Sequence, residues 1–229
     1  MSARNFITAG RKIVAIGRNF SEHAKELGNA VPAAPFFFLK PTSSYVQAPN
    51  PIEIPQGCEV HHEVELGVVI GQQGRDIRAS EADQYVAGYA LAVDMTARNL
   101  QNIVKAKGLP WSAAKGFDTF TPIGDFIPKS KIADASNVEL WLKLDDQLRQ
   151  SGNTRDMIFN VPQLIESVSS VMRLEPGDLI LTGTPKGVSQ VTPGQILTAG
   201  LRLPSGETLS ELRFEAVERQ GLFRIEDHV

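Results

Sequence analysis

Residues 61–71 read HHEVELGVVIG and decide the fold of the chain. The apolar run that follows Glu65, closed by Gly71, is typical of a buried β-strand. Further apolar and β-branched runs come later, separated by Gly, Pro and Asp. They are YVAGYALAVDMT (85–96), VELWLKLDD (138–146), DLILTGTP (178–185) and LRFEAVE (212–218). Runs of this kind predict a core made mainly of strands, which we place at about residues 56–229.

Helical signals interrupt these strands in two places. Residues 96–108 begin with Thr96 as a candidate cap and end at Gly108. Residues 160–172 begin with Asn160 as a cap and carry Pro162 in the first turn, where proline is tolerated. The expected fold class is therefore α+β with strands dominant.

The N-terminal residues, about 1–55, have a sequence pattern that differs from the apolar runs of the part that follows. We expect a strand at 12–17, a short helix at 21–27 that stops at Gly28-Asn29, and a strand at 36–39. No repeat, low-complexity block or linker divides the chain, so we interpret these residues as an N-terminal lobe of a single domain, 1–229. Its aromatic run 36–38 is expected to cover a partner surface or to line the short helix.

Composition excludes several classes of protein. The 229 residues are 42% hydrophobic, as in ordinary globular proteins, and the net charge of −3 offers no general attraction for nucleic acid or an anionic membrane. No apolar run approaches the roughly 20 residues that cross a bilayer. A lone cysteine, Cys58, cannot form an internal disulfide, which suits a reducing compartment. We expect a cytoplasmic or mitochondrial protein, neither secreted nor membrane-bound. The basic start MSARNFITAGRK is only a faint sign of mitochondrial import, because it runs directly into an apolar strand.

Carboxylates on one strand are the first candidate site. Side chains alternate along a strand, so Glu63 and Glu65 share a face. Two buried carboxylates repel each other unless a cation or a shared proton lies between them. Asp94 ends a neighbouring apolar run and can complete the set. Three oxygen ligands suit Mg²⁺, with Mn²⁺ as its substitute.

Other interpretations of these residues stay open at this point. Glu63 and Glu65 fit equally the solvated face of an amphipathic strand, and Asp94 fits a turn or a helix cap. His61 and His62 allow a transition-metal site of mixed ligands. Adjacent strand residues face opposite ways, so at most His61 joins the two glutamates, which makes this the weaker interpretation.

A histidine in the short N-terminal helix is the second candidate site. His23 and Glu26 are three residues apart, so they are neighbours on a helix. Glu26 can then orient the imidazole and raise its basicity, which suits removal of a proton from water. The alternative is an exposed pair without a role.

Taken together, several segments resemble the fumarylacetoacetate hydrolase family, and within it the short acylpyruvase and oxaloacetate decarboxylase members. The segments follow the family's order and spacing over nearly the whole chain. They are IVAIGRNFSEHAKELGN, PFFFLKPTSSY, HHEVELGVVIG, GYALAVDMTARNLQ, KGLPWSAAKGFDTFTPIG, LRQSGNTRDMIF and LTGTPKGV. The resemblance implies a mixed β-sandwich roll of the family's C-terminal domain type, a short N-terminal lid lobe that orders when ligand binds, and assembly as a homodimer.

The resemblance also implies roles for individual residues, and none of the matched positions is substituted. Mg²⁺ or Mn²⁺ is expected on Glu63, Glu65 and Asp94. The expected catalytic residues are His23, Glu26 and Lys115. The expected substrate-binding residues are Arg18, Lys40, Arg98, Gln101, Gly183 and Thr184, with Lys40 near the entrance.

The activity implied is hydrolysis of a C–C bond in acylpyruvates, giving a carboxylate and pyruvate. His23 is expected to activate water, while Lys115 and Gln101 stabilise oxyanion charge. The bond cleavage in an acylpyruvate leaves the enolate of pyruvate on the metal. Oxaloacetate decarboxylation is expected too, since loss of carbon dioxide from oxaloacetate forms the same enolate. Alternatives are oxaloacetate keto–enol tautomerisation, an isomerase or hydratase of aromatic catabolism, and a non-catalytic metal-binding protein. The expected partner is a small 2-oxo acid.

Overall fold

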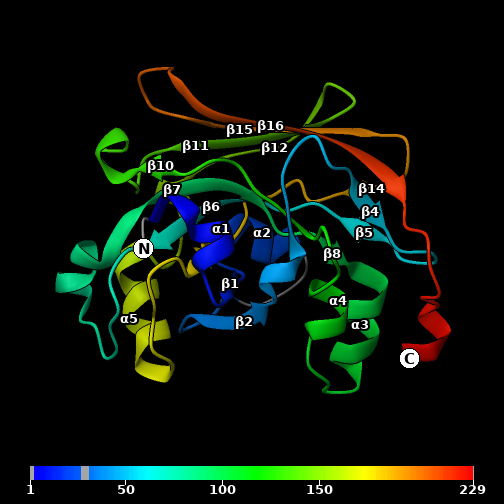
Figure 1. The fold of residues 1–229 in the computed structure, drawn as a ribbon, viewed down its shortest axis with the longest axis horizontal. Coiled ribbons are helices and arrows are strands. Elements are labelled where there is room, and N and C mark those ends of the chain that lie inside the picture. Colours follow the sequence, from blue (N-terminus) through cyan, green and yellow to red (C-terminus); the bar gives the residue numbers. More distant parts are fainter. Residues whose placement is uncertain (1–2, 27–30, 229) are drawn as a thin grey trace.

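The computed structural model describes residues 3–26 and 31–228, and two layers of β-sheet dominate it (Figure 1). One layer is a six-stranded sheet in which β6 and β13 are the central strands. In spatial order its strands are β10 (Ile127–Pro128), β7 (Val86–Val93), β6 (Val64–Ile70), β13 (Leu179–Leu181), β1 (Ile13–Gly17) and β2 (Phe36–Lys40). Neighbours are antiparallel except β1 and β13, which are parallel.

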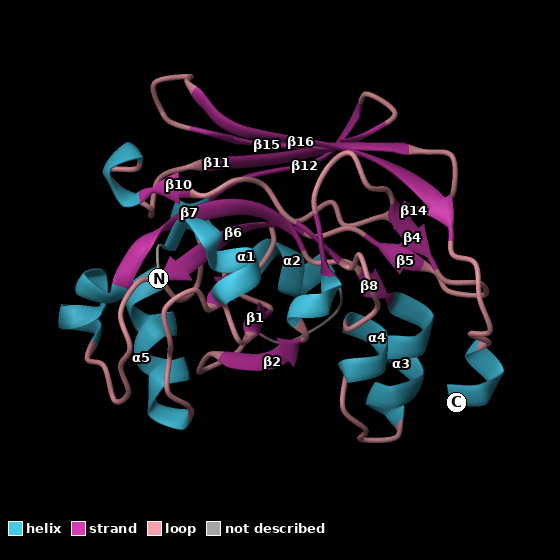
Figure 2. Cartoon of the chain, in the orientation of Figure 1, coloured by secondary structure: helices cyan, strands magenta, loops and turns pink. Residues whose placement is uncertain are grey.

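The second layer is a five-stranded sheet lying over the first (Figure 2). Its strands in order are β12 (Gln147–Asn153), β11 (Glu139–Leu144), β15 (Ile196–Arg202), β16 (Thr208–Glu218) and β4 (Ile52–Ile54). Two small sheets join β14 (Gln190–Val191), β5 (Val60–His61) and β8 (Thr96–Ala97), and β3 (Tyr45–Val46) and β9 (Thr121–Pro122). The strand-dominated α+β fold expected from the sequence is confirmed.

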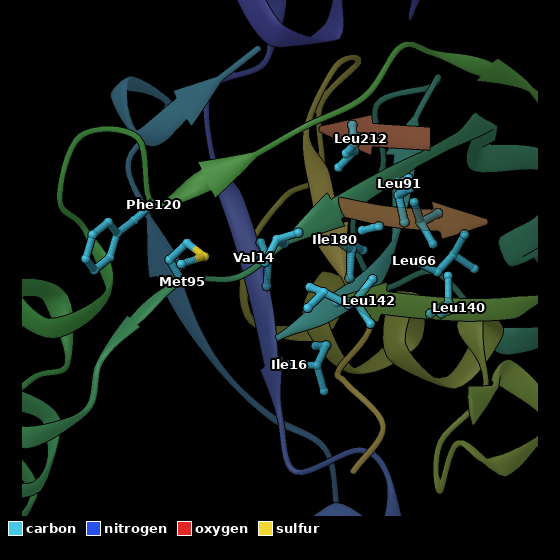
Figure 3. Packing of buried hydrophobic residues seen from close by; sticks show 14 of the residues in the cluster. Val14, Ile16, Leu66, Leu91, Met95, Phe120, Leu140, Leu142, Ile180 and Leu212 are labelled. Carbon is cyan, nitrogen blue, oxygen red and sulfur yellow. The ribbon is translucent and has the colours of Figure 1, made fainter. Parts of the chain in front are cut away.

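The main core lies between the two sheets. Leu66 and Leu91 from the first sheet pack toward Leu140, Leu142 and Leu212 from the second (Figure 3). The other face of the six-stranded sheet is buried as well, against a second cluster that includes Phe6 and Ile123. Every residue of β6 is therefore buried, which explains its nearly continuous apolar sequence.

Helices lie at the ends and outer face of the first sheet (Figure 2). They are α1 (Phe6–Ala9), α2 (Ser21–Glu26), α3 (Arg98–Ala106), α4 (Ser112–Lys115) and α5 (Val161–Val171). The predicted start of α5 is confirmed, since Asn160 caps it in a reciprocal capping box with Gln163. The predicted cap of α3 is wrong: Thr96 lies in β8, and α3 begins at Arg98 without a side-chain cap. Gly28-Asn29, the predicted stop of α2, lies outside the described residues.

The N-terminal residues contribute strands to both main sheets. β1 and β2 belong to the first sheet, whereas β4 pairs with β16 in the second. Phe6 in α1 is 1% exposed, so α1 packs into the folded protein. The division near residue 55 therefore does not follow the sheets. Among the described helices, none is long and apolar enough to cross a bilayer.

Candidate functional site

Three carboxylates meet where β6 begins and β7 ends. Glu63 directly precedes β6, Glu65 is its second residue, and Asp94 follows the last residue of β7. The two strands are antiparallel, and Asp94 N donates to Glu63 O at 2.8 Å, which fixes the ends beside each other. Carboxylate oxygens of all three residues lie within 4.8 Å of one another. Their exposures are 7%, 1% and 1%, so the structure excludes the solvated-face interpretation.

The two adjacent histidines are not part of this cluster. Among the described residues, the cluster that can hold a metal consists of the three carboxylates alone. Both ring nitrogens of His62 form hydrogen bonds within the protein: Nδ1 lies 2.8 Å from Gln150 Oε1, and Nε2 lies 2.9 Å from Ser189 Oγ. Burial lowers the pKa of His62 to about 4, so the ring is neutral at physiological pH. The mixed-ligand interpretation allowed only His61 to join the two glutamates, and among the described residues the cluster that can hold a metal does not include His61 either.

Basic side chains surround the carboxylates. Lys115 Nζ donates to Glu63 Oε2 at 3.0 Å and to Asp94 Oδ2 at 2.7 Å. Lys40 Nζ donates to the other oxygen of Asp94 and to Phe120 O at 2.7 Å. Arg98 forms an ion pair with Glu63 Oε1, which also accepts from the Thr96 hydroxyl at 3.1 Å. Three basic groups thus face three acidic groups.

Position within the cluster decides the protonation of each group. Burial raises the pKa of Glu65 well above its usual range, and the nearby charges of Asp94 and Glu63 raise it further. Burial acts to lower the pKa of Lys115, but Asp94 and Glu63 together raise it above its ordinary value, so Lys115 stays charged. Burial dominates at Lys40 and lowers its pKa. Of the three carboxylates, Glu65 is thus the one whose negative charge is least offset by nearby basic side chains.

This donor set fits a hard divalent cation. The oxygens of Glu63, Glu65 and Asp94 converge, and the donor type is the one that Mg²⁺ and Mn²⁺ prefer. Additional positive charge would offset the repulsion that raises the pKa of Glu65. The residues present therefore fit a divalent metal.

The loop after β13 contacts the carboxylate cluster through Glu65. Gly183 N donates to Glu65 Oε2 at 2.6 Å. Gly183 has φ +94°, and a Cβ there would lie 2.7 Å from the Cβ of Asn19, so the close approach requires glycine. The buried Asn19 amide in turn donates to Thr182 O at 2.8 Å. The backbone of this loop is therefore fixed on both sides.

The hydroxyl of Thr184 is committed within the protein. It donates to Val64 O at 2.8 Å and accepts from Gln150 Nε2 at 2.8 Å. Gln150 is fully buried, and its Oε1 accepts from Val64 N at 3.0 Å. Thr184 lines the cavity beside the carboxylates, and among the described residues its backbone N–H donates no hydrogen bond.

A cavity of about 120 Å³ opens above the carboxylates. Phe36, Phe38 and Trp111 form an aromatic wall, with Phe38 and Trp111 ring centroids 5.3 Å apart. The aromatic run thus lines the cavity through alternate residues of β2. Arg18, at φ +56°, lies over Phe36 with its guanidinium 5.4 Å from the ring centroid. Arg98 and Gln101 of α3 line another side, where Arg98 Nη1 donates to Gln101 Oε1 at 2.6 Å.

Helix α2 carries the predicted water-activating pair. Glu26 accepts from Gly187 N at 3.1 Å, and Glu22 forms an ion pair with Lys186 at 2.9 Å. The helix is thus held against the same loop that contacts Glu65. His23 is a residue of α2, but its side chain lies outside the part of the chain that the structure describes.

One expected position is wrong, and several contributors were missed. Lys40 does not lie at the entrance: it is 2% exposed and contacts Asp94 beneath the cavity, because β2 pairs with β1 and ends there. Sequence reasoning missed Gln150, Trp111 and Lys105. Gln150 and Trp111 occur in two segments that carry the family resemblance, which was the one signal available for them.

Comparison with known proteins gives consistent matches. The family model described as fumarylacetoacetate (FAA) hydrolase C-terminal matches residues 12–215. The mitochondrial oxaloacetate decarboxylase of Dictyostelium discoideum is 61% identical over 198 residues, 86% of this chain and 91% of the relative. The mitochondrial oxaloacetate tautomerase FAHD1 of Arabidopsis thaliana is 57% identical over 212 residues, 92% of each protein. The fumarylpyruvate hydrolase of Pseudomonas aeruginosa, solved with Mn²⁺ and pyruvate, matches with a TM-score of 0.83 at 34% identity, covering 91% of this chain and 90% of that one.

Proposed function

The chain belongs to the fumarylacetoacetate hydrolase family, and from this premise we propose that it is a divalent-metal-dependent enzyme that forms the enolate of oxaloacetate, with keto–enol tautomerisation as its first activity. The observation that carries the proposal is the buried cluster of Glu63, Glu65 and Asp94 with the charged Lys115 beside it. When bound there, the cation would act as a Lewis acid that polarises the 2-oxo group of the substrate.

The chain's own groups match the charge that develops in this reaction. When a water molecule takes the C3 proton, the electron pair of the C3–H bond forms a C2–C3 double bond and the C2 oxygen becomes an oxyanion, which then accepts a proton to give the enol. Lys115 keeps its charge beside the carboxylates and so can stabilise this oxyanion. Gln101 accepts from Arg98 through Oε1, which leaves its amide N–H groups to donate into the cavity. The N–H of Thr184 provides a third donor, suited to the C1 carboxylate.

Decarboxylation of oxaloacetate is a second candidate. It breaks the C3–C4 bond, releases carbon dioxide and leaves the enolate of pyruvate, which then takes a proton from water at C3 to give pyruvate. The observation that favours it is the 61% identity to a protein named oxaloacetate decarboxylase. The donors around the cavity serve both reactions, since both develop negative charge on the C2 oxygen.

Hydrolysis of acylpyruvates needs one more group, a base that takes a proton from water. We assign this role to His23 with Glu26. The support is that Glu26 is anchored by Gly187 N, in the loop that also contacts Glu65. The matching fumarylpyruvate hydrolase structure supports a pyruvoyl substrate for this kind of site.

The compartment and assembly are proposed on the relatives. The matching decarboxylase and tautomerase are named mitochondrial, so we place this protein in mitochondria too, where subcellular fractionation would find it. Assembly as a homodimer rests on the family resemblance, and light scattering on the purified chain would measure it.

One experiment separates the three activities. The purified chain, with Mg²⁺ or with a chelator, is given enol-oxaloacetate, keto-oxaloacetate and an acylpyruvate. Loss of enol absorbance, release of carbon dioxide and release of pyruvate are followed separately. We expect metal-dependent acceleration of enol loss. If none of the three rates exceeds that of the Glu65→Gln variant, the proposed function is wrong.

A further inference from the structure

Helix α3 connects the carboxylate cluster to the mouth of the cavity. Its residues Arg98, Gln101, Asn102 and Lys105 all line the cavity, and their spacing of three to four places them on one helix face. Arg98 and Gln101 are largely buried at the inner end, whereas Asn102 and Lys105 are exposed. Lys105 lies seven residues and, at about 1.5 Å per residue, roughly 10 Å farther along the axis than Arg98.

The basic side chains at the inner end of the cavity form ion pairs with carboxylates, whereas those at its mouth form none within the described part of the chain. At the inner end Lys40, Lys115 and Arg98 are all paired with the carboxylates. At the mouth, Lys105 and Arg18 form no hydrogen bond or ion pair with the described residues, and the Arg18 guanidinium lies over the ring of Phe36. Both cations therefore have donors left for a ligand.

The geometry of an α-helix allows the Lys105 side chain to reach inward along the cavity. On a helix the Cα–Cβ bonds tilt toward the N-terminus, which here is the end that carries Arg98. The four-carbon stem of Lys105 can therefore extend from the mouth back over Asn102, toward a ligand whose inner end lies at the carboxylates. Arg18 approaches the same space from the end of β1, on another wall of the cavity.

We propose that Lys105, with Arg18 as the second cation, is the specificity-determining residue of the site and binds the distal carboxylate of a dianionic 2-oxo acid. The inner end of the site takes the 2-oxo acid group that all candidate substrates share. The mouth then distinguishes a substrate with a second carboxylate, such as oxaloacetate, from a monoanion of the pyruvate type. This inference rests on the proposed function and names its substrate class.

The test compares two charge-removing variants of the same helix. Lys105→Met removes the proposed contact, and Lys107→Met removes an equal charge from the C-terminal cap, which is exposed and does not line the cavity. The full chain with Mg²⁺ is assayed for KM and kcat with oxaloacetate, for inhibition by pyruvate, and for binding of oxalate, whose two carboxylates we expect at the inner end alone.

For Lys105→Met we expect the KM for oxaloacetate to rise about fivefold, the size of one exposed ion pair. Pyruvate inhibition, oxalate binding and kcat should stay within twofold of the wild-type values, and Lys105→Glu should raise the KM further. The Lys107→Met variant should match the wild type in every measurement.

Two outcomes overturn the inference while leaving the proposed function intact. One is an active Lys105→Met variant with an unchanged KM for oxaloacetate. The other is a variant that weakens oxaloacetate, pyruvate and oxalate equally, which would show a general electrostatic or structural effect. If instead the wild-type protein neither converts oxaloacetate nor binds oxalate in the presence of Mg²⁺, the proposed function itself has failed.

Discussion

Gln150 Nε2 donates a hydrogen bond of 2.8 Å to Thr184 Oγ1, and this contact ties the five-stranded sheet to the loop beside the carboxylates. The Thr184 hydroxyl donates in turn to Val64 O, in the strand that carries Glu65. Its proton is thus used within the protein, and the substrate contact proposed for Thr184 is therefore one of its backbone N–H. The side chain of Thr184 positions the loop.

Replacing Thr184 by Val should therefore act on stability more than on substrate contact. The variant removes one of two acceptors of the Gln150 amide and leaves the other, Pro185 O, in place. We expect a loss of about 1–3 kcal/mol in the free energy of unfolding, the usual cost of a buried polar group that loses its partner. Thr184→Ser keeps the hydroxyl and should retain most of this stability. Urea unfolding would measure both; equal stability of Thr184→Val and the wild type would contradict the assigned role.

Glu65→Gln should separate metal binding from folding. The amide oxygen can still accept from Gly183 N, and the substitution removes a buried carboxyl whose pKa burial raises, so we expect an equal or higher melting temperature. Mg²⁺ affinity should fall at least tenfold, because one of three carboxylate ligands is lost.

Glu59→Gln is the matched control for this experiment, since Glu59 is exposed and outside the carboxylate cluster. Calorimetry with Mg²⁺ and a thermal melt of each variant provide the two measurements. Unchanged Mg²⁺ affinity in Glu65→Gln would remove Glu65 from the metal site.

His62 should make the folded protein sensitive to mild acid. Its folded pKa of about 4 lies below the ordinary value of 6.5, so the unfolded chain takes up a proton between these pH values and the folded chain does not. The stability due to the neutral ring is present above pH 6.5 and is lost as the pH falls toward 4. At about 1.4 kcal/mol per pKa unit, the loss is up to about 3 kcal/mol.

Urea unfolding of the wild type and of His62→Gln, at pH 7 and pH 4.5, isolates this contribution. The variant lacks the titrating ring, so its stability should fall less between the two pH values, even if it starts lower. Parallel losses in the two proteins would show that other groups cause the acid sensitivity.

Local sequence patterns predicted those features of the fold and of the site that depend on local geometry. The alternation of a strand placed Glu63 and Glu65 on one face, and the cap and proline at 160–162 marked the start of α5. Both depend on residues within a few positions of each other.

Contacts between distant segments could not be predicted in this way. Lys40 meets Asp94 across 54 positions because strands pair within one sheet, and Gln150 meets Thr184 across 34 because the two sheets pack on each other. In the sequence Thr96 resembles a helix cap, but in the structure Glu63 lies beside it and the Thr96 hydroxyl donates a hydrogen bond to the Glu63 carboxylate. Long-range pairing sets these roles, and a single sequence carries no local sign of it.

A substitution at Gly187 should displace Glu26 of the water-activating pair without affecting the metal site. It has φ +96°, and a Cβ there would lie 1.9 Å from Arg149 O, so Gly187→Ala must shift the loop segment that donates to Glu26. Gly194→Ala is a matched control, because Gly194 has φ +91° but open space around its Cβ position. Backbone strain alone costs about 1–3 kcal/mol in both variants.

If Glu26 orients His23 as proposed, Gly187→Ala should reduce acylpyruvate hydrolysis at least tenfold relative to Gly194→Ala, because a misplaced base loses much of its effect. Tautomerisation and decarboxylation of oxaloacetate should fall less, since they need no activated water, and Mg²⁺ affinity should stay within twofold, because Gly183 rather than Gly187 contacts Glu65. Assays of the three rates and calorimetry on both variants provide the comparison. Equal loss of all three activities in Gly187→Ala would mean that the loop acts on the whole site, and that Glu26 has no separate role in hydrolysis.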